Sequence, residues 1–516
     1  MFLSSAVLVG DRIGADSLYS ILFREGDRLF PDELFDDLFT DRGRRSVPPR
    51  IVATVMVLQR AEGLSDREAV DRFEFDTRWK YAAGGLNVDY PGFVHTVLVD
   101  MRARLRDSLD PDRVFRVVLE VAKQAGLVGR KRVVDSTCLY DAVATMDTVT
   151  LVRSAIRGVL SVADEQTAVA VRAVLRRDDD YQVPGKPVCA WDDKAAREVL
   201  VDALTRDAWA VLAVLDGMAL TGDTRQAAEL LATVTGQDVD QDADGAFRIA
   251  QRVTPNRVIS TVDPQARHGH KTASRHFDGF KAHIGLDPDS EIITAAMVTP
   301  GNVGDGSVAL GLVADVLVLD TGEADSGDGG ERAAVYGDAS YGTGPVLAAL
   351  HAAGVDVYCK TQPPVNADGL YPKDQFNVNL NQGVVTCPAG QTVPITPDKH
   401  GGGTARFGTL CRSCPLVACC TPAKNGRTIR VDQCEADLHH ERERQADPAW
   451  IAEYQATRPK VERHFEHLTR HGNRRARMRG VARIDADFSL LAAAHNLKRL
   501  AVLGLHYLPG SGWVTT

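Results

Sequence analysis

The sequence has no long apolar run and no regular pattern of cysteines. None of its apolar runs approaches the roughly 18–20 residues of a membrane-spanning helix. The nine cysteines are odd in number and irregularly spaced, which argues against a disulfide scaffold and favours a reducing cytoplasm. With 44% hydrophobic and 25% charged residues, the chain of 516 residues has the composition of a globular protein and the length for several domains.

The chain also lacks an excess of positive charge. It holds 60 Lys and Arg against 69 Asp and Glu, a net charge of −9, which counts against a uniformly basic nucleic-acid-binding surface. The basic residues are unevenly distributed, because residues 456–484 hold nine Lys or Arg and two Glu. This stretch therefore carries +7 and the rest of the chain −16. Such a concentration can hold phosphate groups, although the surface of a solvated helix has the same charge pattern.

Residues 1–130 have the apolar spacing of helices. Pro48 and Pro49 precede an apolar stretch typical of a buried helix, and Ser65 with Glu68 forms a capping-box pattern that begins the next helix. Short helices joined by glycine-containing turns occur in helix-turn-helix proteins that read DNA and also in helical bundles that do not. The spacing alone favours the helical bundle.

Strand-like segments after residue 130 indicate an α/β fold with a mixed sheet. The expected strands lie at 131–137, 257–264, 280–287, 290–299, 333–338 and 355–360. Antiparallel strands come first, and strands that alternate with helices follow, which together give a mixed sheet. A ribonuclease H-like sheet has this order, but the pattern alone does not select it over other mixed sheets.

Three acidic residues lie where carboxylates can form a catalytic site. Asp135 and Asp338 each end an apolar strand, and Glu462 lies in the basic segment RPKVERHFEHLTR. Carboxylates at strand ends can gather in one cleft, where two or three of them bind Mg²⁺ with open water positions. Two such ions about 3.5–4 Å apart stabilise the attacking and leaving oxygens of phosphoryl transfer. Taken singly, each acid is more often a solvated surface residue, and Asp263 and Asp305 are weaker candidates.

Several motifs, in their order along the chain, resemble the DDE transposases of bacterial insertion sequences. They are VVDST, VTPGNVGDG, YGDASYG and RPKVERHFEHLTR, supported by LSDREAVDRFEFDTRWKYAAG, FDGFKAHIGLD and CRSCPLVACCTPAKNGRT. The nearest group is the one numbered eleven-eighty-two, which is related to the insertion-sequence-four group. The resemblance implies that Asp135, Asp338 and Glu462 are catalytic and hold two Mg²⁺ (or Mn²⁺) ions.

The same resemblance implies the reaction and its partners. The expected activity is metal-dependent DNA cleavage and strand transfer at the ends of an insertion sequence. The expected partners are double-stranded DNA, in the form of terminal inverted repeats and target DNA, and a second copy of the chain in a homodimer on DNA. The expected location is the bacterial cytoplasm, in association with the nucleoid.

The segment around Glu462 follows the family's glutamate motif in part. Arg458 and Glu462 keep the family's spacing, while Tyr454 lies one residue early, with Gln455 in its place. Thr469 stands where the family has lysine. The spacing of four places Arg458 and Glu462 on one helix face. The basic residues expected to contact DNA are Arg458, Lys460, Arg463, Arg470, Arg474, Arg475, Arg477 and Arg479.

Pattern and resemblance together predict four regions. A ribonuclease H-like mixed-sheet core combines residues 131–138, 256–365 and 449–505. A helical N-terminal domain over 1–130 is the candidate reader of DNA ends, a helical insertion occupies 139–255, and a cysteine-rich insertion occupies 366–435.

The cysteine-rich insertion contains a candidate zinc site. Cys411 and Cys414 form a Cys-x-x-Cys pair, Cys420 follows, and Cys387 lies upstream, so four thiolates could bind one structural Zn²⁺ tetrahedrally. By spacing alone Cys419 is an alternative to Cys420, and the resemblance favours Cys420. Reduced thiols without metal are the competing interpretation.

Two other functions fit the same sequence. One is a ribonuclease H-like nuclease that cuts DNA without strand transfer. The other is a catalytically inactive, DNA-binding descendant of a transposase. The intact set of three acids argues against the inactive form.

Overall fold

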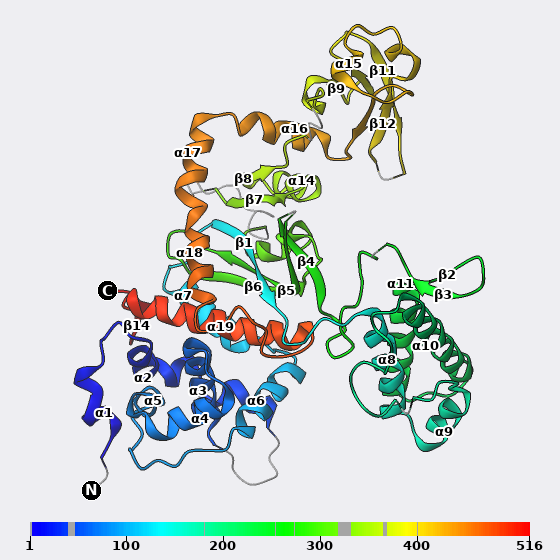
Figure 1. Ribbon diagram of the computed structural model, residues 1–516. Coiled ribbons are helices and arrows are strands. Elements are labelled where there is room, and N and C mark those ends of the chain that lie inside the picture. Colours follow the sequence, from blue (N-terminus) through cyan, green and yellow to red (C-terminus); the bar gives the residue numbers. More distant parts are fainter. Residues whose placement is uncertain are drawn as a thin grey trace.

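The computed structural model describes residues 3–39, 47–179, 181–252, 254–272, 274–317, 332–364, 369–399 and 401–516. A mixed sheet lies at the centre, with a group of N-terminal helices below it, a helical insertion beside it and a small β subdomain at the far end (Figure 1). The α/β class with a mixed sheet is confirmed. In the described part of the chain, each helix is too short or too polar to cross a membrane.

The N-terminal helices form one packed unit, and their ends follow the predicted signals. Their bounds are α1 Ser5–Val9, α2 Leu18–Leu29, α3 Pro49–Glu62, α4 Asp66–Phe75, α5 Thr77–Ala82, α6 Thr96–Asp107 and α7 Arg113–Gln124. Helix α3 begins at Pro49 and ends at Gly63, whose φ of 71° is easiest for glycine. At the start of α4, Ser65 and Glu68 each accept a hydrogen bond from the other's backbone N–H, which confirms the capping box.

The central sheet has six strands in the order β4-β5-β1-β7-β8, with β6 paired to β5. Antiparallel pairs join β4 and β6 to β5 and β5 to β1, whereas β1, β7 and β8 run parallel. Helices α12, α13 and α14 accompany these strands, and α14 crosses between β7 and β8. The bounds are β1 Lys131–Tyr140, β4 Arg267–Thr272, β5 Arg275–Leu286, β6 Ile293–Pro300, β7 Ala334–Gly342, β8 Asp356–Thr361, α12 Ala309–Leu312, α13 Ala314–Leu317 and α14 Gly344–Ala352.

The strand expected at 257–264 is wrong. These residues are irregular, and β4 pairs with the first part of β5 instead. The helical insertion explains this difference, because its side chains form hydrogen bonds and an ion pair with the polar groups of this segment. The Gln237 side chain accepts the Val258 N–H at 2.8 Å, and Arg257 forms an ion pair with Asp238 at 2.6 Å.

The long segment between β1 and β4 is mostly helical and lies beside the sheet (Figure 1). It has its own apolar core. Its helices pack α8 against α11 and α10 against both. A short hairpin, which the sequence did not predict, follows α11. The bounds are α8 Thr148–Val162, α9 Glu165–Val174, α10 Lys194–Leu215, α11 Gly222–Asp238, β2 Val239–Gln241 and β3 Phe247–Ile249.

The cysteine-rich segment forms a five-stranded antiparallel sheet in the order β13-β12-β11-β10-β9. Its elements are β9 Asn377–Asn379, β10 Val384–Thr386, β11 Thr392–Pro397, β12 Gly403–Arg406, α15 Val417–Cys420 and β13 Thr428–Val431. We refer to residues 369–433 as the cysteine subdomain. It is inserted between β8 and the helices that return the chain to the central sheet (Figure 1).

The chain ends in four helices and a hairpin. Their bounds are α16 Glu435–Arg444, α17 Pro448–Thr457, α18 Pro459–Leu468, α19 Val481–Val502, β14 His506–Leu508 and β15 Gly512–Val514. The helical prediction from residue 449 to about 504 is therefore correct at both ends, but residues 469–480 form turns instead of helix. This break contains Gly472 and Gly480, both with positive φ.

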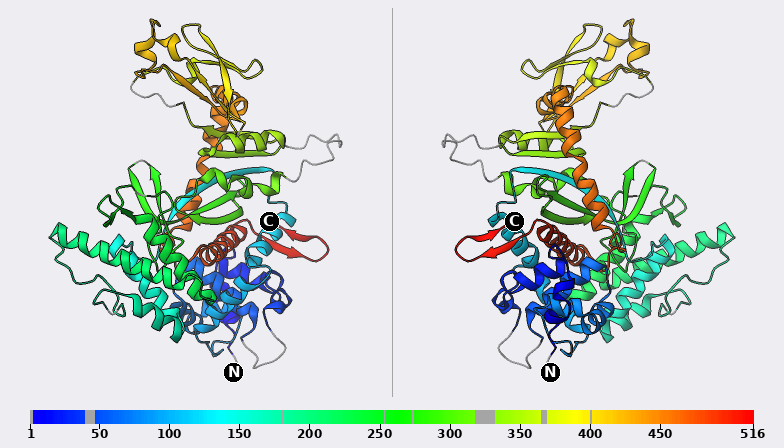
Figure 2. Two further views of the ribbon diagram at one scale, coloured as in Figure 1. Left: turned by 90° about the vertical axis from the view of Figure 1, so that its right-hand side faces the viewer. Right: turned by 90° about the vertical axis from the view of Figure 1, so that its left-hand side faces the viewer.

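Helix α19 lies between the central sheet and the N-terminal helices, and the views in Figures 1 and 2 agree on this. It contacts β6 on one side and α2, α3 and α7 on the other. Asn496 is fully buried in this layer, and its side chain both donates to the Ile293 carbonyl and accepts from the Ile293 N–H, each at 2.8 Å. The amide therefore satisfies a backbone position of β6 that would otherwise be buried without partners.

We predict that Asn496→Ala lowers the free energy of unfolding by about 2–4 kcal/mol, because it leaves two buried backbone groups unsatisfied. Chemical denaturation of the purified chain measures the change. The exposed Asn381→Ala is the matched control and should change stability by less than about 0.5 kcal/mol. Equal stabilities for the two variants would contradict this role of Asn496.

Candidate active site

The three predicted acids line one cavity of about 530 Å³. Asp135 comes from β1, Asp338 from β7 and Glu462 from the first turn of α18. The two aspartates do not end their strands as expected, since β1 continues to Tyr140 and β7 to Gly342. The hydrogen-bonded pairing between β1 and β7, however, ends before the two aspartates.

The position of the aspartates follows from the register of the sheet. The parallel pairing of β1 and β7 stops at Val133 opposite Tyr336, and Asp135 and Asp338 each lie two residues beyond it. Residues two apart on a strand point to the same face, so the two carboxylates occupy equivalent positions on neighbouring strands. The strands diverge at this point, and the cavity opens there.

Arg458 joins the sheet to the helix that carries Glu462. Its guanidinium lies 3.0 Å from an Asp135 carboxylate oxygen and 3.6 Å from a Glu462 oxygen. The Arg458 side chain is only 8% exposed and that of Asp135 14%, whereas the Glu462 side chain is 69% exposed. Pro459 is the first residue of α18, a position that its missing N–H allows.

Burial raises the pKa of Asp135 to about 6, although the Arg458 guanidinium opposes this rise. The nearby Asp338 carboxylate adds to it. Asp338 accepts a hydrogen bond from the Ser340 N–H at 2.8 Å, and no ion pair among the described residues reaches it. The cavity therefore contains carboxylate charge that its own cations balance incompletely.

A second acidic position was a weak candidate in the sequence but lines the same cavity. Asp305 accepts hydrogen bonds from Ser136 at 3.0 Å and from Lys281 at 2.8 Å. Its charge is thus neutralised by a lysine, unlike that of Asp338. The alternation of β5 could have indicated that Lys281 points to the site, but nothing local in the sequence pairs it with Asp305. The other weak candidate, Asp263, is buried outside the cavity lining and accepts from the Gly480 N–H at 3.1 Å.

The basic residues predicted to contact DNA divide into two groups. Four of them, besides Arg458, are engaged within the protein: Lys460 with Asp289 at 3.7 Å, Arg463 with Glu291 at 3.2 Å, Arg470 with Glu466 at 3.0 Å, and Arg477 with the Leu64 carbonyl. Three others form no ion pair with a described residue: Arg474, Arg475 and Arg479. All three are exposed, as are the paired Arg463 and Arg470, and Arg474 also lines the cavity. The cavity gains further basic character from His270 and Lys271 on β4.

The four predicted zinc ligands also come together, at a separate place. Cys387, Cys411, Cys414 and Cys420 line one small pocket of the cysteine subdomain. Cys419 is exposed and does not line it. The structure thus brings together both predicted sets of side chains, the three acids and the four cysteines.

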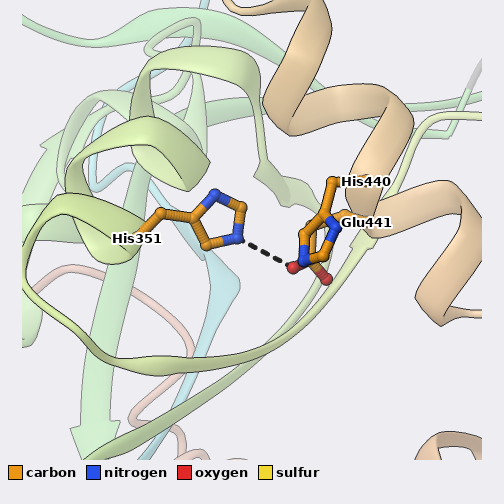
Figure 3. Close-up of side chains that lie close together, drawn as sticks. All are labelled: His351, His440 and Glu441. Atoms are coloured by element: carbon orange, nitrogen blue, oxygen red, sulfur yellow. Dashed lines mark hydrogen bonds and ion pairs between the residues drawn. The ribbon is translucent and has the colours of Figure 1, made fainter.

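A third cluster was not predicted. His351 on α14 lies between two acids of α16, with Nδ1 2.7 Å from Asp437 and Nε2 2.8 Å from Glu441, and His440 stands beside them (Figure 3). Among the described residues, His351, His440 and Glu441 form the one group of three or more His, Cys, Asp or Glu whose ligand atoms all lie within 4.8 Å of one another. Glu441 is fully buried and also accepts from Arg444 at 2.8 Å.

These contacts occupy both nitrogens of His351 and one oxygen of Glu441, while Glu441 Oε2 is buried without a hydrogen-bond partner among the described residues. Both nitrogens of His351 face carboxylates, an arrangement that suits the protonated imidazole. Burial lowers the pKa of His351, but the bonds to Asp437 and Glu441 raise it by more, so the net shift is upward. We therefore interpret the cluster as an ionic clamp between α14 and α16, with no residue in the cavity of Asp135.

This interpretation predicts a pH-dependent stability. Because the pKa of His351 is raised on folding, its contribution is complete below the unfolded value of about 6.5 and is lost as pH rises through the folded value. His351→Gln should therefore destabilise the chain by about 1–3 kcal/mol at pH 6 and by less at pH 9, as measured by denaturation at both pH values. His439→Gln, which changes an exposed histidine of α16, should have little effect at either pH. A loss that grows with pH would contradict the clamp.

Two family models match the chain. Residues 386–501 match the model described as "Transposase DDE domain", and residues 10–104 match the "Transposase domain (DUF772)". No curated protein and no solved structure matches. The first match contains Arg458 and Glu462, while Asp135 and Asp338 lie outside both. The two matches support a transposase of the DDE type, an enzyme that acts on DNA.

Proposed function

We propose that this protein is a DDE transposase that cleaves DNA at the ends of an insertion sequence and joins those ends to target DNA. One observation carries the proposal, which is that Asp135, Asp338 and Glu462 line a single cavity although they are far apart in the sequence. The group numbered eleven-eighty-two remains the family group proposed from the sequence. The two transposase matches support the same class of enzyme independently of Asp135 and Asp338, which lie outside both.

The residues of the cavity fit the divalent metal ions that this chemistry needs. Asp135, Asp338 and Glu462 would hold two Mg²⁺ or Mn²⁺ ions, since all three offer the hard oxygen ligands that these cations prefer. Asp338 lacks a cationic partner among the described residues, and the pKa of Asp135 is raised, so added positive charge would stabilise both carboxylates. Such ions, when bound, activate the attacking oxygen and stabilise the leaving oxygen of a phosphodiester.

The chain's own residues would orient the DNA around these acids. Arg458 fixes Asp135 and faces Glu462, so it keeps the strand and the helix at a set distance. Lys271 and Arg474 line the same cavity and can contact the phosphates on either side of the scissile bond. Water, and later a DNA 3′-hydroxyl, would be the nucleophile, so no Ser or Tyr nucleophile is required.

The arrangement of the strands supports a ribonuclease H-like core. Three antiparallel strands, β6, β5 and β1, are followed by β7 and β8 parallel to β1, which is the order expected from the resemblance. The helical insertion between β1 and β4 and the cysteine subdomain after β8 extend this core without interrupting its pairing. The N-terminal helices would read the terminal inverted repeats, and two copies of the chain would hold two ends together.

Asp338→Asn and Glu462→Gln should each reduce metal-dependent cleavage and joining by more than about 100-fold, because each removes a proposed metal ligand. The assay uses purified protein, Mg²⁺ and a labelled duplex that carries the element's own end. Glu443→Gln, an exposed acid on α16, should keep wild-type activity. If either cavity variant is as active as wild type, the proposed site is wrong.

The same assay separates the alternatives. Cleavage without joined products would favour the nuclease, and DNA binding without cleavage in Mg²⁺ or Mn²⁺ would favour the inactive descendant. Folding of each variant is checked by its thermal transition, so a loss of activity with an unchanged transition belongs to the site.

The exposed arginines near the cavity should dominate the salt dependence of DNA binding. The triple variant with Arg474, Arg475 and Arg479 changed to Ala should lower the slope of log K against log [salt] by about 2–3, since each lost phosphate contact contributes about 0.9. The control changes three exposed arginines in the helical insertion and the segment after it: Arg172, Arg225 and Arg252. Fluorescence anisotropy at several salt concentrations measures both slopes, and equal slopes would contradict a localised DNA-binding surface.

A further inference from the structure

The cysteine subdomain has a small apolar core for its length. Only eight of its hydrophobic side chains form the buried cluster: Phe376, Val385, Val393, Ala405, Phe407, Cys420, Ile429 and Val431. A segment of this size rarely buries enough apolar surface to be stable without a crosslink such as a disulfide or a metal ion. All nine cysteines of the chain are free thiols, so no disulfide supplies one.

Four thiols converge at one end of this core, from three separate parts of the subdomain. Cys387 follows β10, Cys411 and Cys414 lie around the short helix before α15, and Cys420 ends α15. They line one pocket of about 20 Å³, which is close to the space that a single water molecule needs. The other lining side chains are mostly apolar, among them Tyr371, Phe376 and Phe407.

One backbone N–H donates to a thiol sulfur, and a tight turn follows Cys387. The Arg427 N–H donates to Cys411 Sγ at 3.4 Å. The turn after Cys387 closes with a hydrogen bond from the Gly390 N–H to the Cys387 carbonyl at 2.8 Å, and Gly390 has a φ of 76°. Both features hold sulfur atoms at tight turns, where the side chain points to the pocket.

The four thiols share a pocket whose other lining side chains are mostly apolar. Four thiolates cannot share an apolar pocket without a cation between them, since each would repel the others. A soft divalent cation removes this repulsion and binds thiolates directly.

The structure also separates the two adjacent candidates for the fourth ligand. Cys420 is 8% exposed and lines the pocket, whereas Cys419 is exposed and does not line it. Neighbouring helical residues point about 100° apart, so only one of the two can face the pocket. This pair supplies a matched control within the chain.

We propose that Cys387, Cys411, Cys414 and Cys420 bind one structural Zn²⁺ that crosslinks the turn after β10 to the segment 411–420. With Zn–S bonds of about 2.3 Å, tetrahedral ligands lie roughly 3.8 Å apart. Among the described residues, no three of these sulfurs lie mutually within 4.8 Å, so binding draws the thiols together. The site is independent of the carboxylate cavity, and its failure would leave the proposed function standing.

The test measures metal in the full chain, purified without chelators from zinc-supplemented medium. Elemental analysis should find about one equivalent of zinc in the wild type and in Cys419→Ser, and less than half in Cys411→Ser and Cys420→Ser. Less than half an equivalent of zinc in the wild type, iron in its place, or an equal loss in Cys419→Ser would overturn the assignment.

A second measurement does not depend on the folding of variants. Cobalt(II) exchanged into the wild-type chain should give the intense visible and near-ultraviolet bands of tetrahedral thiolate ligation. Added Zn²⁺ should abolish these bands, and the contraction of the site should protect Cys387 and Cys414 from thiol-modifying reagents. Cobalt bands of weak octahedral type, or modification rates unchanged by zinc, would overturn the proposal.

Discussion

The ion pair between Asp135 and Arg458 determines how the candidate active site is assembled. A carboxylate this deeply buried at the centre of a sheet requires a cation or several donors, and Arg458 supplies the cation from a helix more than 300 residues away in the sequence. Glu462 lies one helical turn further on, so the same contact sets its distance from the sheet. Tyr336 strengthens this connection, because its hydroxyl donates to Glu453 on the same helical stretch at 2.6 Å.

The acids could be identified from the sequence because their signals are local. Asp135 and Asp338 follow apolar residues within their strands, and Arg458 with Glu462 has helical spacing, so residue type and spacing suffice. Lys281 and Asp305 could not be paired in this way, because their contact depends on how β5 and the segment after β6 meet in space. The strand expected at 257–264 is wrong for a similar reason, since the side chain of Gln237 accepts a hydrogen bond from the Val258 N–H, which a strand would use for pairing.

The caps and the cysteine subdomain illustrate the same limit. The capping box at Ser65 and the helix that begins at Pro49 need only a few neighbouring residues, and both follow the expected pattern. The five strands of the cysteine subdomain are three to six residues long and rich in turns, so their periodicity is too short to detect.

The charge count of the basic stretch was also an incomplete guide to which residues are available to DNA. Four of its eight predicted DNA contacts form ion pairs within the protein, and Arg477 bonds a backbone carbonyl, which leaves Arg474, Arg475 and Arg479 without an ion pair among the described residues.

The packing of helix α19 would fix the spacing at which this protein cuts DNA. It packs on β6 and on the N-terminal helices at once, and Asn496 bonds it directly to the sheet backbone. The two parts therefore cannot turn independently. If the N-terminal helices read the element's end, the number of base pairs between the sequence that is read and the bond that is cut is set by the protein. Each added base pair would rotate the scissile phosphate by about 34–36° away from the carboxylates. The packing of α19 would therefore fix both the distance and the rotation angle between the sequence that is read and the bond that is cut.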